Sequence, residues 1–251
     1  MHWIITLPNL NPQWPAPSNI SAVTTYRYPG SSLAPFDFNN LGIHVGDNLS
    51  HVQTNRQALL QALQLPSEPE WLDQTHSTEC VIVEKETNRQ ADAAITRSPN
   101  HVLAIMTADC LPILICNQQG TEIAGIHAGW KGLANGIIEN TLKKMDSPAS
   151  ELMAWIGPAI CQECYEVGDD VRDMFLSNYA FAADYFKKFN NKWLINLPYL
   201  AEKILSKEKI QAIYQSEACT YENKNHFYSY RRDGQTGRMA SLIWFNQLTQ
   251  D

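Results

Sequence analysis

The chain has 251 residues, of which 44% are hydrophobic and 18% are charged, as is ordinary for a globular protein with a buried core. It carries 19 lysines and arginines against 26 aspartates and glutamates, which gives a formal net charge of −7. This net negative charge argues against general binding to nucleic acid or to a membrane surface, because such binding needs a basic face. One or two arginines still suffice to bind a small anion.

The sequence gives no sign of export or of membrane insertion. Its first eight residues lack the basic start of a signal peptide, and no apolar stretch approaches the roughly 20 residues of a membrane span. Six cysteines without a secretory signal are typical of free thiols in a reducing compartment, so we expect a cytoplasmic protein. In that setting a cysteine near histidines indicates a metal site or catalysis before it indicates a disulfide.

The first part of the chain predicts an extended lead-in, a strand and a long loop. Residues 9–17 are rich in proline, and residues 21–27 have the β-branched side chains of a strand. Residues 28–47 carry the glycines, prolines and asparagines of a loop. A loop of this length inside a compact domain is usually functional.

A helix is predicted next, beginning near Asn48 or Ser50 and ending before Pro66. Arg56 lies on its inward face, because it follows Val52 by four residues and precedes Leu59 by three. An unpaired buried charge is costly, so we expect this guanidinium to meet a carboxylate, a phosphate or a cavity. A structural salt bridge and an anion site are both compatible with this position.

Strands and helices alternate through the rest of the chain. Strands are predicted at 80–84, at 122–127 and, with a polar break at Asp109 and Cys110, at 102–116. The predicted helices are 129–145, 169–178 and 198–206, and residues 227–245 predict a hairpin with its turn at 233–237. No repeat or linker divides the sequence, so we predict a single domain over residues 1–251 of the α+β class.

Three short polar breaks in apolar segments carry side chains that bind metals: His76, Cys110 and His127. Two imidazoles and one thiolate suit zinc, and three protein ligands leave a fourth position open for water or substrate. A lone cysteine in a β-rich core is nevertheless more often a small buried hydrophobe. The residues by themselves therefore leave a metal site and three unrelated core positions both open.

Several short strings resemble those of the YfiH family, also called the laccase-domain or polyphenol oxidase family. They run in order through most of the chain: NLG at 40–42, HVGD at 44–47, TADCLP at 107–112, HAGWKG at 127–132, IGPAI at 156–160, SYRR at 229–232 and TGR at 236–238. Two positions depart from the family pattern. Ser77 stands where the family commonly has glycine, and residues 28–31 differ from its usual loop, which bears on the range of substrates.

The resemblance implies mixed β-sheets with flanking helices in a layered sandwich, and a zinc ion held by His76, Cys110 and His127. It implies a purine nucleoside phosphorylase that acts on a purine nucleoside (adenosine, inosine or methylthioadenosine) and phosphate, with adenosine deamination as a further activity. We expect a monomer or a small homo-oligomer. Arg56 and Arg231 are the candidates to bind phosphate, and Asp109 is a candidate acid/base group or an orienter of the metal ligand beside it.

Four alternatives remain open from sequence. Copper accepts the same donors with Met106 as a weak axial ligand, which would give a polyphenol oxidase. Cys110 and His127 also match the dyad of a cysteine hydrolase. The same site in an editing hydrolase for peptidoglycan precursors, or a metal-stabilised binding module without activity, would fit as well. We interpret Cys161 and Cys164 as incidental thiols, and Cys80, Cys116 and Cys219 as core residues.

Overall fold

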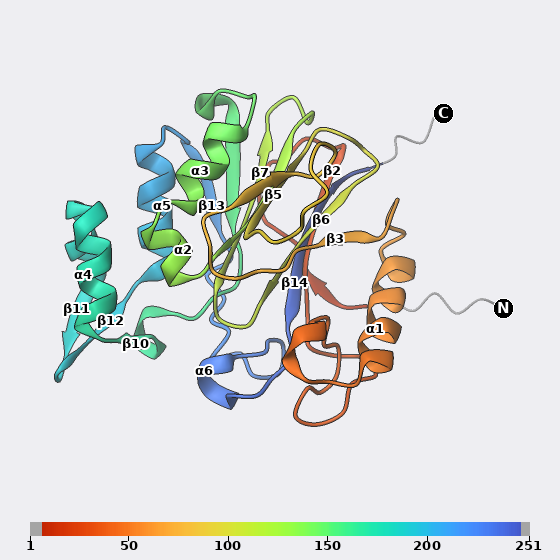
Figure 1. Cartoon of the computed structure of the whole chain (residues 1–251), viewed down its shortest axis with the longest axis horizontal. Helices are drawn as coiled ribbons and strands as arrows, with labels where there is room; N and C mark the ends of the chain where they lie inside the picture. Colours follow the sequence, from red (N-terminus) through yellow and green to blue (C-terminus); the bar gives the residue numbers. More distant parts are fainter. Residues whose placement is uncertain (1–6, 247–251) are drawn as a thin grey trace.

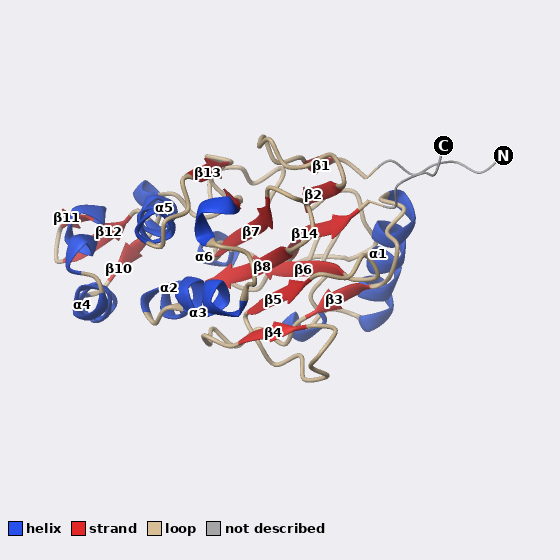
Figure 2. Ribbon diagram, turned by 90° about the horizontal axis from the view of Figure 1, so that it is seen from above, coloured by secondary structure: helices blue, strands red, loops and turns tan. Residues whose placement is uncertain are grey.

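The computed structural model describes residues 7–246, so residues 1–6, whose sequence predicts no signal peptide, lie outside the described residues. Two β-sheets pack on each other, and helices cover their outer faces (Figure 1). Figure 2 shows the sheets between α1 on one side and a group of helices on the other. The fold is α+β with mixed sheets and flanking helices in layers, as predicted.

The first sheet has five strands in the order β1-β2-β14-β6-β3. All neighbours in this sheet are antiparallel except β3 and β6, which are parallel. Helix α1 (Leu49–Ala62) packs on its outer face through Leu59. The strands are β1 (Asn9–Leu10), β2 (Ile20–Thr25), β3 (Pro69–Trp71), β6 (Val102–Thr107) and β14 (Met239–Phe245).

The second sheet has six strands in the order β13-β9-β7-β8-β5-β4, with parallel pairs at both edges and antiparallel pairs between them. Its outer face is covered by helices that share one apolar cluster with it. The strands are β4 (Cys80–Ile82), β5 (Ala93–Thr96), β7 (Leu111–Asn117), β8 (Ile123–Ala128), β9 (Leu152–Ile156) and β13 (Ala212–Gln215). The helices are α2 (Trp130–Ala134), α3 (Ile137–Lys144), α4 (Asp169–Asn178) and α5 (Leu197–Lys207).

A small third sheet lies at the far end of the molecule beside α4 (Figure 1). Its order is β10-β12-β11, and all its pairs are antiparallel. The strands are β10 (Glu166–Val167), β11 (Phe186–Phe189) and β12 (Lys192–Ile195). Short 3₁₀ turns complete the chain: η1 (Ile43–Val45), η2 (Ala149–Glu151), η3 (Gln162–Cys164) and η4 (Ala180–Tyr185).

Strand β6 illustrates why the sequences of the central strands are continuous runs of apolar residues. Leu103 and Ile105 join the cluster between the two large sheets, whereas Val102 and Ala104 join the cluster beneath α1. Successive side chains of a strand point to opposite faces, and both faces of this strand are buried. The scaffold is therefore rigid where β6 ends and the polar residues begin.

Two predicted elements were wrong. The helix predicted at 129–145 is broken into α2 and α3, because Gly136 adopts a left-handed conformation with φ of 93°. The hairpin predicted at 227–245 does not form: its first half holds the short helix α6 (Tyr230–Asp233), and β14 pairs with β2 and β6 instead. Gly234 follows a helix there, so the turn residues mark a helix end.

Among residues 7–246 no helix has the length and apolar character needed to cross a membrane.

Candidate metal centre

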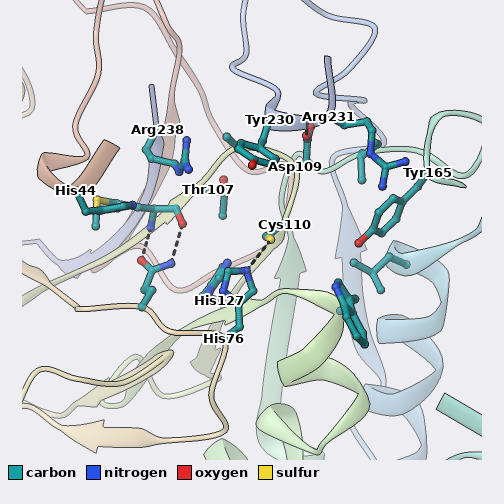
Figure 3. Close-up of a pocket in the computed structure, with 16 residues that line it drawn as sticks. His44, His76, Thr107, Asp109, Cys110, His127, Tyr165, Tyr230, Arg231 and Arg238 are labelled. Atoms are coloured by element: carbon teal, nitrogen blue, oxygen red, sulfur yellow. Dashed lines mark hydrogen bonds between the residues drawn. The ribbon is translucent and has the colours of Figure 1, made fainter. Parts of the chain in front are cut away.

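Three segments that are distant in the sequence bring His76, Cys110 and His127 together (Figure 3). His76 lies in the loop between β3 and β4, Cys110 directly precedes β7, and His127 lies near the end of β8. The ligand atoms of the three lie within 4.8 Å of one another, and Cys110 Sγ is 3.5 Å from His76 Nε2. A sulfur and a nitrogen bound to one tetrahedral zinc lie roughly 3.6 Å apart, given bonds of about 2.3 and 2.05 Å. The donors therefore fit this ion.

Backbone geometry holds the three donors close. Strands β7 and β8 are paired so that Leu111 lies opposite Ala128, which places Cys110 beside the end of β8. A Cβ at Gly129 would lie 2.5 Å from His76 Cδ2 and 3.2 Å from Cys110 Sγ, so only glycine fits there. His76 itself has φ of 61°, an uncommon conformation for histidine that is typical of functional sites.

Asp92, immediately before β5, orients both histidines. Its Oδ1 lies 2.7 Å from His127 Nδ1 and accepts a hydrogen bond from the backbone N–H of His76 at 3.0 Å. Its Oδ2 accepts from the N–H and the hydroxyl of Ser77 at 2.6 and 2.7 Å. Because His127 Nδ1 is bound to a carboxylate, Nε2 of the same ring is left to bind a metal.

The charges of the site favour metal ligands. Burial opposes the Cys110 thiolate, but the positive charge of His127 and hydrogen bonds from His127 and His76 outweigh it and lower the pKa of Cys110 to about 6. Burial also opposes the charged ring of His127, yet the charges of Cys110 and Asp92 and the hydrogen bonds they accept raise its pKa to about 9. A cysteine that is already a thiolate at neutral pH is prepared for ligation, and a bound metal would take the place of the His127 proton.

The donors lie in the wall of a pocket of about 510 Å³, a size typical of small-molecule sites. Part of the wall is aromatic and part is cationic. Its lining residues are His44, Gln74, His76, Met106, Thr107, Ala108, Asp109, Cys110, His127, Trp130, Ile160, Tyr165, Leu197, Tyr230, Arg231 and Arg238.

Arg238 is a half-buried cation in this wall without an acidic partner. Its Nη1 donates to the carbonyls of Thr236 and Gly237 at 3.0 Å each, and no carboxylate of residues 7–246 forms an ion pair with it. Burial lowers the pKa of Arg238, and burial together with Arg238 lowers the pKa of His44 beside it. An arginine placed in this way is suited to an anion that arrives with the ligand.

Thr107 offers a hydroxyl in the same region (Figure 3). The side chain ends β6 and is 2% exposed, and its Oγ1 has no hydrogen-bond partner within the described part of the chain. Buried hydroxyls are normally satisfied. A polar ligand in the pocket would supply the partner that this group needs.

The family of the chain follows from its sequence. A family model described as multi-copper polyphenol oxidoreductase laccase matches residues 21–246. The chain belongs to this family. It is 43% identical over 235 residues to "Purine nucleoside phosphorylase YfiH" of Escherichia coli strain K12, covering 93% of this chain and 97% of that protein. It is 45% identical over 242 residues to "Purine nucleoside phosphorylase" of Haemophilus influenzae, covering 94% and 98%.

Two solved structures share the fold. A Neisseria meningitidis protein, NMB0706, matches with a TM-score of 0.91 and 42% identity, over 95% of this chain and 99% of that one. YlmD from Geobacillus stearothermophilus matches with a TM-score of 0.81 and 27% identity, over 96% of this chain and all of that one.

Asp109, in the turn of this YfiH-family chain before Cys110, is fully engaged by neighbours. It accepts hydrogen bonds from Thr220 Oγ1 at 2.6 Å, Ser229 Oγ at 3.0 Å and the backbone N–H of Arg231 at 2.7 Å. Its φ of 94° turns the chain into β7. These contacts favour a positioning role, because they tie the Cys110 turn to two other segments; an acid/base role for Asp109 stays a prediction.

The two predicted phosphate ligands, Arg231 and Arg56, lie in different surroundings. Arg231 lines the pocket, with its guanidinium 5.1 Å from the Tyr165 ring and Nη1 donating to the Glu166 carbonyl at 2.8 Å. Arg56 is not among the lining residues: it stacks 3.9 Å from the Trp71 ring centre and donates two hydrogen bonds to the Leu41 carbonyl. A carbonyl and an indole face already satisfy the Arg56 charge, and no carboxylate of residues 7–246 forms an ion pair with it. The contacts therefore favour Arg231 over Arg56 as a phosphate ligand, and both roles stay predictions.

Sequence reasoning missed Asp92, Thr107, His44 and Arg238 as site residues. Asp92 had a visible signal, since it is one acidic residue among alanines directly before an apolar strand. Arg238 and His44 lie in strings that carry the family resemblance, but nothing in their spacing joins them. The contact of Leu41 N–H with the Arg238 carbonyl, 3.1 Å, shows how the two segments meet.

Proposed function

We propose that this chain is a zinc-dependent purine nucleoside phosphorylase. The observation that carries the proposal is the convergence of His76, Cys110 and His127 in a pocket that also holds the unpaired cation Arg238. The two bacterial relatives named as purine nucleoside phosphorylases cover nearly the whole chain and support the same activity. His76, Cys110 and His127 would hold the ion, which when bound supplies a Lewis-acidic positive charge close to the reacting atoms.

Arg238 and Arg231 bind the phosphate in this proposal. Phosphorolysis brings a phosphate oxygen to C1′ of the nucleoside while the bond from C1′ to the base breaks and its electron pair leaves with the base. A phosphate anion needs cations that are already in place, because they then cost no reorganisation during the reaction. His44, whose pKa is lowered, adds a neutral ring beside Arg238 that accepts or donates a hydrogen bond.

The aromatic wall fits the purine base. Tyr230 lines the pocket although it is 61% exposed, so a face or edge of its ring is open to a ligand. Tyr165 points its hydroxyl into the pocket (Figure 3), and burial together with the charge of Cys110 raises its pKa, so the hydroxyl remains a donor at neutral pH. Stacking of a base on such a ring contributes about 1–3 kcal/mol.

Adenosine deamination is the further activity of the proposal and has less support from the wall. It requires a group that moves protons between water and the base. Asp109 is the one carboxylate among the lining residues of the described chain, and three donors already occupy it. We therefore rank phosphorolysis first.

A cysteine hydrolase is the second candidate function, because Asp92, His127 and Cys110 also match the acid, base and nucleophile of a catalytic triad. The acid binds His127 Nδ1 and the lowered pKa of Cys110 suits a nucleophile. His76 favours the metal interpretation, since a third donor 3.5 Å from the sulfur has no task in a triad. Copper, which the family description names, accepts the same donors with Met106 nearby, so metal analysis must identify the ion.

The test combines elemental analysis with an assay of ribose 1-phosphate release from inosine and phosphate. The wild-type protein should contain zinc and release ribose 1-phosphate, and His76→Ala should lose both. Arg238→Met should retain zinc and raise the KM for phosphate about 10-fold or more, the usual worth of a charge-assisted hydrogen bond. Arg56→Met is the matched control and should leave this KM nearly unchanged. Full activity in metal-free protein would refute the proposal.

A further inference from the structure

A second group of metal-binding side chains lies outside the pocket described above. The sulfur atoms of Cys161, Cys164 and Cys219 lie within 4.8 Å of one another, and all three cysteines are free thiols. Sequence alone suggested incidental thiols here, because Cys161 and Cys164 have no second Cys-x-x-Cys pair. The third sulfur comes from a residue 55 positions further along the chain.

The backbone builds this cluster from two segments. Residues 159 and 219 form an isolated parallel bridge, in which the Ala159 N–H donates to the Ala218 carbonyl at 3.3 Å and the Thr220 N–H to the Ala159 carbonyl at 3.0 Å. Turn η3 then returns Cys164 towards Cys161, with the Cys164 N–H donating to the Cys161 carbonyl at 3.2 Å. The three side chains therefore have fixed Cα positions before any ligand binds.

One hydrogen bond in the cluster is directed at a sulfur atom. The backbone N–H of Cys161 donates to Cys219 Sγ at 3.3 Å. N–H donors on sulfur are a usual feature of thiolates that ligate metals, where they tune the bound ion. The Cys219 sulfur therefore already accepts one hydrogen bond of the kind that metal-bound thiolates accept.

The cluster is open to solvent on one side. Cys161 and Cys219 line a second pocket of about 300 Å³, separate from the first, together with Glu163 and Glu217. Cys161 and Cys164 are half-buried, whereas Cys219 is 7% exposed. An ion can therefore enter, and two carboxylates at the mouth attract a cation.

We propose that Cys161, Cys164 and Cys219 form a second metal site, which takes Zn²⁺ as a three-thiolate centre with its fourth position facing this pocket. Sulfurs on one tetrahedral zinc lie about 3.8 Å apart, so the side chains need to close by no more than about 1 Å. On binding, each thiol loses its proton to solvent and its sulfur lone pair forms a bond to zinc, while the ion releases water. Because each thiol must lose its proton to bind the ion, binding strengthens as pH rises.

The position of the site gives it a structural consequence for the first pocket. Ile160, next to Cys161, donates its N–H to the Asp109 carbonyl at 3.1 Å, and Thr220, next to Cys219, binds the Asp109 carboxylate. A metal that joins Cys161 to Cys219 thus fastens the two segments that hold the Cys110 turn.

The test uses full-length Cys110→Ala protein, in which the first site has lost its thiolate, kept reduced with a phosphine. Cd²⁺ is the probe, because the intensity of its sulfur-to-metal charge-transfer band reports the number of thiolate ligands. The band should saturate at three thiolates, and Cys161 and Cys164 should become protected from iodoacetamide in peptide maps. Adding Cys164→Ser, a change in a half-buried turn, should cut the band by about a third. Adding Cys80→Ser instead should leave it unchanged.

Two outcomes would overturn the site. One is a Cys110→Ala protein that shows no charge-transfer band and no metal-dependent protection of Cys161 or Cys164. The other is a protein that loses two mass units on mild oxidation, forming a disulfide within the cluster, yet binds no Cd²⁺ when reduced. Circular dichroism and the melting temperature of each variant establish that it is folded. The iodoacetamide maps use the Cys110→Ala protein without any further substitution, so this result does not depend on the folding of the double variants.

Discussion

Replacing Asp92 with asparagine isolates the group that orients the two histidines. The side chain keeps its shape but loses its charge, and its amide cannot accept from all five donors that now surround the carboxylate. Although burial opposes the charge, hydrogen bonds from His127 and Ser77 lower the pKa of Asp92 to about 2, against a usual value near 3.8. A shift of this size corresponds to about 2 kcal/mol of stability at neutral pH.

The sign of this contribution defines its pH dependence. A lowered pKa stabilises the folded protein above the usual pKa of aspartate, and the contribution falls as pH drops towards 2. The free energy of unfolding of Asp92→Asn should therefore be about 2 kcal/mol lower than that of wild type at pH 7. Near pH 3 the difference should shrink to about half of this value. Denaturant unfolding of metal-free protein at the two pH values measures the difference.

The same substitution should weaken zinc binding by about 10- to 100-fold, the usual effect of losing a carboxylate behind a histidine ligand. Competition with a chelator measures this affinity. Glu122→Gln is the matched control: Glu122 is 2% exposed and accepts from the N–H groups of Asp146 and Ser147, away from the pocket. It should lower stability and leave zinc affinity intact. Equal zinc affinity in Asp92→Asn and wild type would refute the orienting role.

Three further results are expected. In chelator-treated protein, iodoacetamide should alkylate Cys110 with a half-maximal rate near pH 6, and added zinc should protect this thiol. Cys80 should not react, because burial raises its pKa to about 11. The Asn55 side chain forms hydrogen bonds with Ser31, Ser32 and two backbone carbonyls of the loop at residues 28–47. Asn55→Ala should therefore lower the unfolding free energy by at least about 2 kcal/mol and speed proteolysis within this loop. Thr220→Val should lower kcat and retain zinc, since it frees one oxygen of Asp109; an unchanged kcat would contradict this.

Local chemistry made the regular elements predictable. The helix predicted at 169–178 matches α4, and the polar break predicted at Asp109 and Cys110 matches the turn between β6 and β7. In both cases the signal lies within a few neighbouring residues. The predicted hairpin failed because glycine after a polar residue marks the end of α6 as well as it marks a β-turn.

The partners of the site residues depend on contacts between distant segments. Asp92 meets His127 because β5 and β8 are paired with Ala93 opposite Ile126, a register that no single strand sequence specifies. Arg56 binds the Leu41 carbonyl, and every residue of a chain has such a carbonyl, so no side-chain pattern indicates this partner. The resemblance named the three metal donors, but their orientation required the fold.

The most direct test of the central claim titrates zinc into chelator-stripped protein while ribose 1-phosphate release from inosine and phosphate is followed. Cys164→Ser protein is used, so that the second thiol cluster does not confuse the stoichiometry. We predict activity that rises with zinc and saturates near one equivalent, and no activity at any zinc level when His76→Ala is added. Activity that is independent of zinc, or undiminished by His76→Ala, would contradict the account.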